Sequence, residues 1–267
     1  MPFAQHPRPE TLASLNDVSP LPFWLDDPSR PEPAEPLAEA TTADLAIVGA
    51  GFTGLWTALL AKETDPSLDV VLLEAEETAS GASGRNGGFV AASLTHGFLN
   101  GLERWPSDLA ALTRMGQANL EAIAQAVAHY QIDCDFQRSG ELTMATEPYQ
   151  LDELRLLPEL ATPYGERLEW LEAEQARALV DSPTYLGGLY NRRGVAMANP
   201  ARLAWGLRRA CLDLGVRLYE HTPVRRLDSR GTAVFVHTPH GRVRARWVAL
   251  ATNAYPPLLK RLSVYIA

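Results

Sequence analysis

The sequence predicts an α/β fold organised around a strand, glycine turn, helix and strand at residues 44–74. An apolar run over 44–48 indicates a buried strand and leads directly into the turn Gly49-Ala50-Gly51-Phe52-Thr53-Gly54. Apolar residues between 53 and 62 then recur at helical spacing. A second apolar run over 70–73 ends on Glu74. This order of elements is typical of a Rossmann-type βαβ unit.

Each glycine of the turn has a separate physical role. Gly49 permits the tight turn off the strand, Gly51 lets the backbone approach a pyrophosphate, and Gly54 lets the helix pack closely on the strand. The helix start then offers free N–H groups and a positive dipole end to phosphates. Glu74, at a strand end, would accept hydrogen bonds from ribose hydroxyls and repel the 2′-phosphate of NADP. We therefore predict a bound dinucleotide; the alternative is a turn that merely packs a helix on a sheet.

Composition narrows the class of protein. The 267 residues are 46% hydrophobic and carry a formal net charge of −8, without a basic run, so nucleic acid is not an expected partner. Cys134 and Cys211 lie far apart and have no metal-ligand spacing, which predicts two buried thiols in a reducing cytoplasm and no metal site. No apolar run is long enough to predict a membrane span.

Residues 1–43 form a proline-rich leader in which regular helix is not expected. Its stretch Pro20–Leu25 is the exception, because Phe23 and Trp24 are costly to leave in water. We expect this stretch to dock on the body of the protein. A partner-binding motif is the alternative interpretation.

A second glycine-rich loop, Gly81-Ala82-Ser83-Gly84-Arg85-Asn86-Gly87-Gly88, follows the second strand. Its backbone could follow a ligand closely, and its hydroxyl, cation and amide side chains stand between glycines. A loop at this point lies at the carboxyl edge of the sheet, where α/β folds bind ligands. A flexible linker is the alternative.

The rest of the chain predicts a mixture of helices and strands. Helices are expected over 107–131 with Ser107 as N-cap, 149–160, 173–180, and from Asn199-Pro200 to 214. Strands are expected over 132–136, 140–146, 187–191, 216–219, 224–227, 233–238 and 242–250. The final apolar run, Val248–Ala251, indicates a buried parallel strand that ends on Thr252-Asn253 at the ligand edge.

Three segments together resemble the FAD-dependent amine and amino-acid oxidases, the D-amino-acid oxidase-like flavoproteins, nearest their γ-glutamylputrescine oxidase-like branch. They are VGAGFTGL at 48–55 with Glu74, GASGRNGG at 81–88, and 199–253 with its VALATNAY ending. The resemblance covers roughly 44–267. It implies a Rossmann-type FAD-binding domain over 44–93 and 194–256, with a partial α+β substrate domain inserted at 94–193. Residues 257–267 would begin the return to that domain, so we expect a partial sequence.

The resemblance also implies cofactor contacts for matching positions. The glycine turn would hold the FAD pyrophosphate, Glu74 the adenosine ribose, and Val224, on a strand, the adenine through its backbone. The 81–88 loop would run past the pyrophosphate and ribityl chain. The residues implied at the cofactor are Gly49, Gly51, Phe52, Thr53, Gly54, Glu74, Ala75, Ser83, Arg85, Asn86, Gly87, Gly88, Val224, Ala251 and Thr252.

The implied reaction is oxidation of a C–N bond of an amine or amino acid by hydride transfer to FAD, followed by hydrolysis of the imine, with oxygen or another electron acceptor reoxidising the flavin. No catalytic residue is assigned. His96 could attach FAD covalently, but an ordinary loop histidine is the favoured interpretation. The rival functions are an NAD-dependent dehydrogenase and a non-catalytic fragment with an incomplete nucleotide site.

Overall fold

The computed structural model describes residues 8–253 and 258–259. Its largest sheet has six strands in the order β8-β2-β1-β11-β10-β9. Four of them run parallel, and β10 and β9 continue the sheet as an antiparallel hairpin. The bounds are β1 (Ala40–Val48), β2 (Val70–Leu73), β8 (Arg217–Tyr219), β9 (Arg226–Arg230), β10 (Ala233–His237) and β11 (Arg242–Leu250). The α/β fold predicted from the sequence is therefore confirmed.

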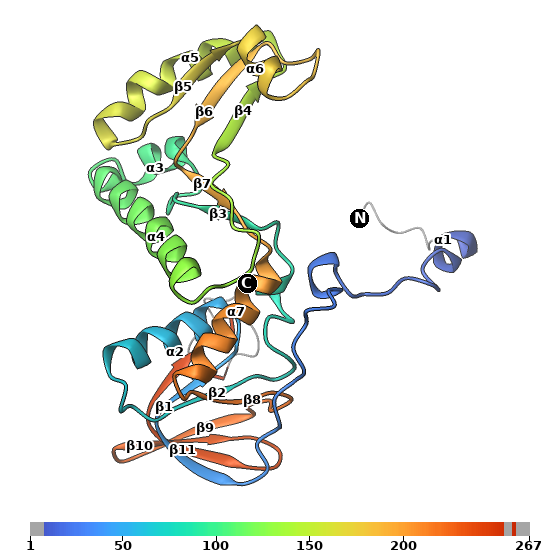
Figure 1. The fold of residues 1–267 in the computed structure, drawn as a ribbon, viewed down its shortest axis with the longest axis vertical. Coiled ribbons are helices and arrows are strands. Elements are labelled where there is room, and N and C mark those ends of the chain that lie inside the picture. Colours follow the sequence, from blue (N-terminus) through green and yellow to red (C-terminus); the bar gives the residue numbers. More distant parts are fainter. Residues whose placement is uncertain (1–7, 254–257, 260–267) are drawn as a thin grey trace.

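Two helices cover one face of this sheet, α2 (Phe52–Thr64) and α7 (Pro200–Asp213), which lie side by side (Figure 1). Leu55, Ala58 and Leu59 of α2 are fully buried, as their helical spacing predicted. The predicted N-cap of α7 is confirmed, because the Asn199 side chain accepts a hydrogen bond from the Arg202 N–H at 3.1 Å. The short turn 49–51 joins the end of β1 to the start of α2.

The residues between 94 and 193 form a second group of elements, at the top of Figure 1. They contain an antiparallel sheet in the order β4-β6-β5, with helices packed against it. A two-stranded pair, β3 (Phe89–Ala91) with β7 (Val195–Met197), lies between this group and the six-stranded sheet. The bounds are α3 (Phe98–Arg104), α4 (Leu109–His129), β4 (Glu141–Ala145), α5 (Pro148–Ala161), β5 (Glu169–Glu172), α6 (Ala173–Leu179) and β6 (Gly187–Asn191).

Several predicted elements were wrong in kind or in position. The predicted strand 132–136 is a loop: Ile132 and Cys134 point into the core, but Asp135 has a φ of 52°, a left-handed conformation that ends any strand. The residue capping α4 is Asp108, not Ser107. Val224 precedes β9 and is not on a strand. The last residues of β11 pair parallel with β1 as expected, but they are half-buried.

The leader differs from its prediction in three places. A five-residue helix, α1 (Pro9–Ala13), forms because its proline stands at the first helical position, where the missing N–H costs nothing. The predicted docking of 20–25 is confirmed for Trp24 and for Leu25, which is 3% exposed. It was wrong for Phe23, which is 82% exposed. Strand β1 also begins inside the stretch assigned to the leader.

Both cysteines are free and buried in the core, Cys211 on α7 and Cys134 in the loop after α4. Burial raises the pKa of Cys134 to about 11, with the charges of Asp135 and Asp133 adding to the effect. Burial also raises the pKa of Cys211 to about 12, helped by Glu63. Since the thiolate is the reactive form, both side chains are protonated in the folded protein at neutral pH.

We therefore expect neither thiol of the folded protein to react with a maleimide at about pH 8, where an ordinary cysteine reacts readily. Mass spectrometry after brief labelling should show an unmodified chain, and the same treatment in denaturant should add two labels. Labelling of either cysteine in the folded chain within the same time would show that the thiol is accessible and ionised.

No helix among the described residues combines the length and the apolarity needed to cross a bilayer.

Candidate functional site

The glycine turn lies at the carboxyl ends of β1 and β11. The Ala251 N–H donates to the Val48 carbonyl at 2.8 Å, which brings the end of β11 beside the turn. Gly49 has a φ of 104°, and a Cβ there would lie 2.6 Å from the Ala251 carbonyl oxygen. A Cβ on Gly54 would lie 1.8 Å from the Gly49 carbonyl oxygen. The packing roles predicted for these two glycines therefore hold.

Ser83 closes the turn from the second glycine-rich loop. Its Oγ accepts a hydrogen bond from the Phe52 N–H at 2.9 Å, at the first residue of α2. A Cβ on Gly51 would meet this oxygen at 2.8 Å. Gly51 itself caps α2 without any side-chain hydrogen bond. The two glycine-rich segments, far apart in the sequence, thus meet at one helix N-terminus, where the dipole favours an anion.

Glu74 stands at the end of β2, beside the same turn. Its Oε2 accepts the Ala50 N–H at 2.6 Å and its Oε1 accepts the Glu76 N–H at 3.1 Å. These two donors stabilise the carboxylate in one orientation. A carboxylate fixed at this place has lone pairs left, and the contact with ribose hydroxyls stays a prediction.

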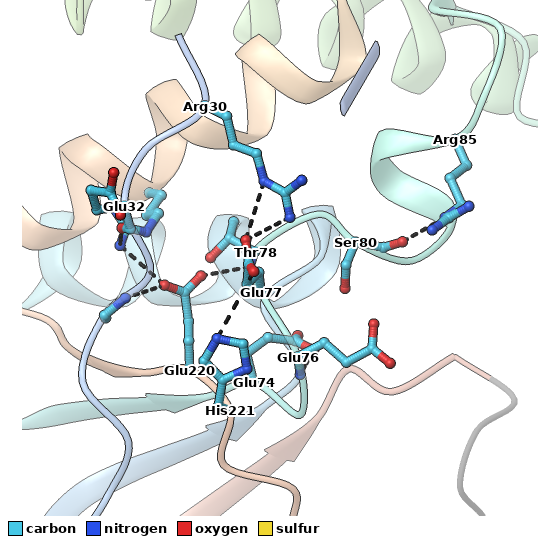
Figure 2. Close-up of polar contacts among 12 residues, drawn as sticks. Arg30, Glu32, Glu74, Glu76, Glu77, Thr78, Ser80, Arg85, Glu220 and His221 are labelled. Atoms are coloured by element: carbon cyan, nitrogen blue, oxygen red, sulfur yellow. Dashed lines mark hydrogen bonds and ion pairs between the residues drawn. The ribbon is translucent and has the colours of Figure 1, made fainter. Parts of the chain in front are cut away.

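Arg85 and Asn86 shape their own loop. The Arg85 Nε donates to the Ser80 carbonyl at 2.6 Å (Figure 2). The Asn86 amide donates to the Ser83 carbonyl at 2.8 Å and accepts from the Gly88 N–H at 2.9 Å. Gly88 has a φ of 77°, and a Cβ there would lie 2.4 Å from the Ala198 carbonyl oxygen. The side chains of Arg85 and Asn86 therefore maintain the loop conformation, and a ligand contact by either remains a prediction.

The other predicted contacts lie around the same edge. Thr252 follows Ala251 at the end of β11, while Thr53 and Ala75 are exposed beside the turn and beside Glu74. Val224 is buried, and neither of its backbone polar groups bonds to another described residue. Gly87 lies against the Phe89 ring. His96 is elsewhere, in the exposed turn before α3, with a φ of 54°.

The sequence interpretation missed one charged group near this edge, Glu220, which is 2% exposed. Figure 2 shows its carboxylate between the leader and the turn that follows Glu74. Burial opposes its ionisation, but the N–H groups of Ala34 and Thr78 and the guanidinium of Arg208 outweigh this and hold the pKa of Glu220 below its ordinary value. The available signal was a lone acid directly after an apolar strand, in YEHTPV.

One cavity adjoins these elements and a second lies apart from them. The first, of about 500 Å³, begins at Phe52, Asn86 and Gly88 and is walled by apolar side chains of α2, β3, α4 and α7. The other, of about 340 Å³, lies in the upper group of elements and is lined by His96, Asn191 and Glu166 among mainly apolar residues. Burial raises the pKa of Glu166. Asn86 and Gly88 of the glycine-rich loop line the first cavity, which therefore adjoins the candidate site.

The residues at the edge of the sheet fit a dinucleotide such as FAD. The positions of Gly49, Gly51 and Gly54 have no space for a side chain, the N-cap residue of α2 is a glycine, and a fixed carboxylate stands beside it. This combination suits a pyrophosphate next to a ribose. Among the described residues, no group of three or more His, Cys, Asp or Glu side chains is placed to hold a metal ion.

Comparison with known proteins gives the same assignment. The family of FAD-dependent oxidoreductases matches residues 44–266. The chain is 37% identical to the gamma-glutamylputrescine oxidoreductase of Escherichia coli K12 over 247 residues, which are 90% of this chain and 57% of that protein. It is 25% identical to the sarcosine oxidase subunit beta of Rhodobacter capsulatus, covering 81% of this chain and 51% of that subunit. The chain thus spans about half the length of these curated relatives.

A solved structure agrees in fold. The glycine oxidase of Geobacillus kaustophilus superposes with a TM-score of 0.69 and 26% sequence identity, over 82% of this chain and 57% of the oxidase. The matched family is defined by FAD, so the alternative of an NAD-dependent dehydrogenase is not supported. The motifs, the fold and these matches agree that the chain belongs to the FAD-dependent oxidoreductase family.

Proposed function

We propose that the protein oxidises a C–N bond of an amine or amino acid with FAD as its cofactor. The observation that carries the proposal is the meeting of the Gly49–Gly54 turn, Ser83 and Glu74 at one sheet edge, in a chain that is 37% identical to a γ-glutamylputrescine oxidoreductase. When bound, FAD supplies the hydride acceptor for the carbon next to nitrogen, and water then hydrolyses the imine.

The chain's own residues have binding roles in this proposal. The N-terminus of α2 and the Ser83 loop hold the pyrophosphate, and Glu74 binds the adenosine ribose. Val224 binds the adenine through backbone groups, while Ala251 and Thr252 flank the cofactor. The other contacts carried over from the sequence are Phe52, Thr53, Ala75, Arg85, Asn86, Gly87 and Gly88.

The domain assignment follows from the same proposal. Residues 44–93 and 194–256 form the FAD-binding part, and residues 94–193, with the β4-β6-β5 sheet, form the first part of a substrate domain. We also propose a cytoplasmic protein, because its two cysteines are unpaired, and oxygen or another acceptor as the oxidant. The net charge of −8 disfavours binding to a nucleic acid, and we propose no nucleic-acid partner.

Anaerobic mixing of the FAD-loaded protein with candidate substrates tests the reaction. Polyamines, γ-glutamyl amines, D-amino acids and N-methyl amino acids should be compared, and at least one class should bleach the oxidised flavin absorption. An equimolar imine hydrolysis product, an aldehyde or a keto acid, should then be found. A flavin that stays oxidised with all four classes but is reduced by NADH would contradict oxidation of a C–N bond.

A further inference from the structure

The leader crosses the FAD-binding part as an extended segment, visible as the blue coil on the right of Figure 1. We call residues 20–37 the strap. It contacts α7 and both ends of the 74–88 stretch, which carries Glu74 and the Ser83 loop. None of the motifs that indicate FAD includes any residue of the strap, so its contacts need a separate explanation.

The first anchor of the strap is at Trp24 and Leu25. The Trp24 indole N–H donates to the Asn86 carbonyl at 2.8 Å. Leu25 packs with Ala201 and Trp205 of α7. A Cβ on Gly84 would lie 2.7 Å from a Leu25 methyl carbon. The strap therefore contacts the loop that brings Ser83 to the start of α2.

The second anchor is the buried carboxylate of Glu220. Its Oε2 accepts the Ala34 N–H of the strap at 2.5 Å, and its Oε1 accepts the Thr78 N–H at 2.5 Å. Arg208 of α7 donates to Oε2 at 3.1 Å and also to the Glu32 carbonyl at 3.0 Å. One carboxylate thus joins the strap, the turn after Glu74 and α7 (Figure 2).

The segment around Glu220 also holds Glu74. The Glu74 N–H donates to the Tyr219 carbonyl at 2.9 Å, and the Thr222 N–H donates to the Glu74 carbonyl at 2.7 Å. Thr222 Oγ1 in turn accepts the Leu37 N–H of the strap at 3.0 Å. Both backbone groups of Glu74 are therefore fixed by a segment that the strap covers.

An ion pair nearer the surface also joins the strap to the turn after Glu74. Arg30 of the strap donates to Glu77 at 2.6 Å, with both side chains partly exposed. An exposed pair of this kind contributes little stability. The buried Glu220 differs, because removing its charge leaves Arg208, which is 11% exposed, without its carboxylate partner.

We propose that the strap is a positioning element for the cofactor, which fixes the 78–88 loop and Glu74 in their binding geometry through Trp24 and Glu220. The proposal rests on the proposed function for the identity of the ligand. Trp24 and Glu220 are positioning residues, since they act through Asn86 and Thr78. Loosening either anchor raises the free energy of the binding conformation, and the affinity for FAD falls accordingly.

Two variants with matched controls test the strap in the full chain. Trp24→Phe removes one hydrogen bond and keeps an aromatic ring; Trp105→Phe makes the same change where the indole N–H bonds to no described residue. Glu220→Gln removes the buried charge; Glu35→Gln makes the same change on an exposed residue of the strap. Hydrogen exchange over 78–88, measured without FAD, and the Kd for FAD are the readouts.

We expect hydrogen exchange over 78–88 to be faster in both test variants, and the Kd for FAD to rise by roughly tenfold. Hydrogen exchange in β6 should stay unchanged in both. The two control variants should match the unaltered chain in exchange and in Kd. If Glu220→Gln does not fold, Trp24→Phe decides alone. Unchanged exchange in Trp24→Phe, or faster exchange with an unchanged Kd, overturns the positioning role. If the unaltered chain binds no FAD, that result contradicts the proposed function and not the role of the strap. Hydrogen exchange over 78–88 in the test variants then decides whether the strap holds the loop in place.

Discussion

Replacing Gly54 by alanine is expected to destabilise the fold by more than about 3 kcal/mol, at the upper end of overpacking effects, and to abolish FAD binding. The added methyl group would lie 1.8 Å from the Gly49 carbonyl oxygen and 3.0 Å from its carbon, which are backbone atoms. Neither can rotate away, so α2 must move off the end of β1. The displacement also separates the α2 N-terminus from Ser83. Urea unfolding followed by circular dichroism measures the loss.

Gly81→Ala is the matched control. It makes the same substitution in the adjoining glycine-rich loop, where no atom lies within 4 Å of the new Cβ and φ is −84°. Its stability should be unchanged or up to about 1 kcal/mol higher, because alanine restricts the unfolded chain. Equal unfolding midpoints for the two variants would show that Gly54 does not set the approach of α2 to the glycine turn.

The Glu74→Gln substitution is expected to weaken FAD binding by roughly ten- to a hundredfold, the loss of a charged hydrogen bond worth about 1.5–3 kcal/mol. The amide keeps the volume of the side chain but has one acceptor oxygen where the carboxylate has two. The Ala50 and Glu76 N–H groups and the ribose hydroxyls then compete for that oxygen. Isothermal titration of each purified protein with FAD measures the change.

Glu76→Gln is the control for this second substitution. Glu76 is two residues further along the same turn, and its exposed side chain makes no hydrogen bond among the described residues. It should bind FAD as the unaltered chain does. An affinity for Glu74→Gln that matches this control would remove Glu74 from the ribose site.

The βαβ unit could be predicted from the sequence because each of its signals is local. The apolar run before Gly49, the helical spacing after Gly54 and the acid at residue 74 need no knowledge of distant residues. The hairpin of β10 and β11 was also predicted correctly, because an apolar run over 233–236 and an alternating run over 242–246 flank its turn. The family resemblance rested on these same local motifs, and the comparisons confirmed it.

The missed features depend on contacts between distant segments. Strands β3 and β7 have three residues each and exist through their pairing, which no short run of sequence announces. The 132–136 run alternates apolar and polar residues as a strand does, and its apolar residues Ile132 and Cys134 are buried as that alternation implies. It forms no strand because no neighbouring strand among the described residues pairs with it along its length. Glu220 carries no motif; its role appears when the strap, Thr78 and Arg208 meet around it.

Calorimetric titration of the purified chain with FAD, and separately with NAD, tests whether the glycine turn holds FAD. We expect saturable binding of one FAD per chain, absent in Gly54→Ala and retained in Gly81→Ala, with NAD binding far more weakly. A chain that is folded, binds NAD in preference to FAD and loses neither ligand in Gly54→Ala would contradict this expectation.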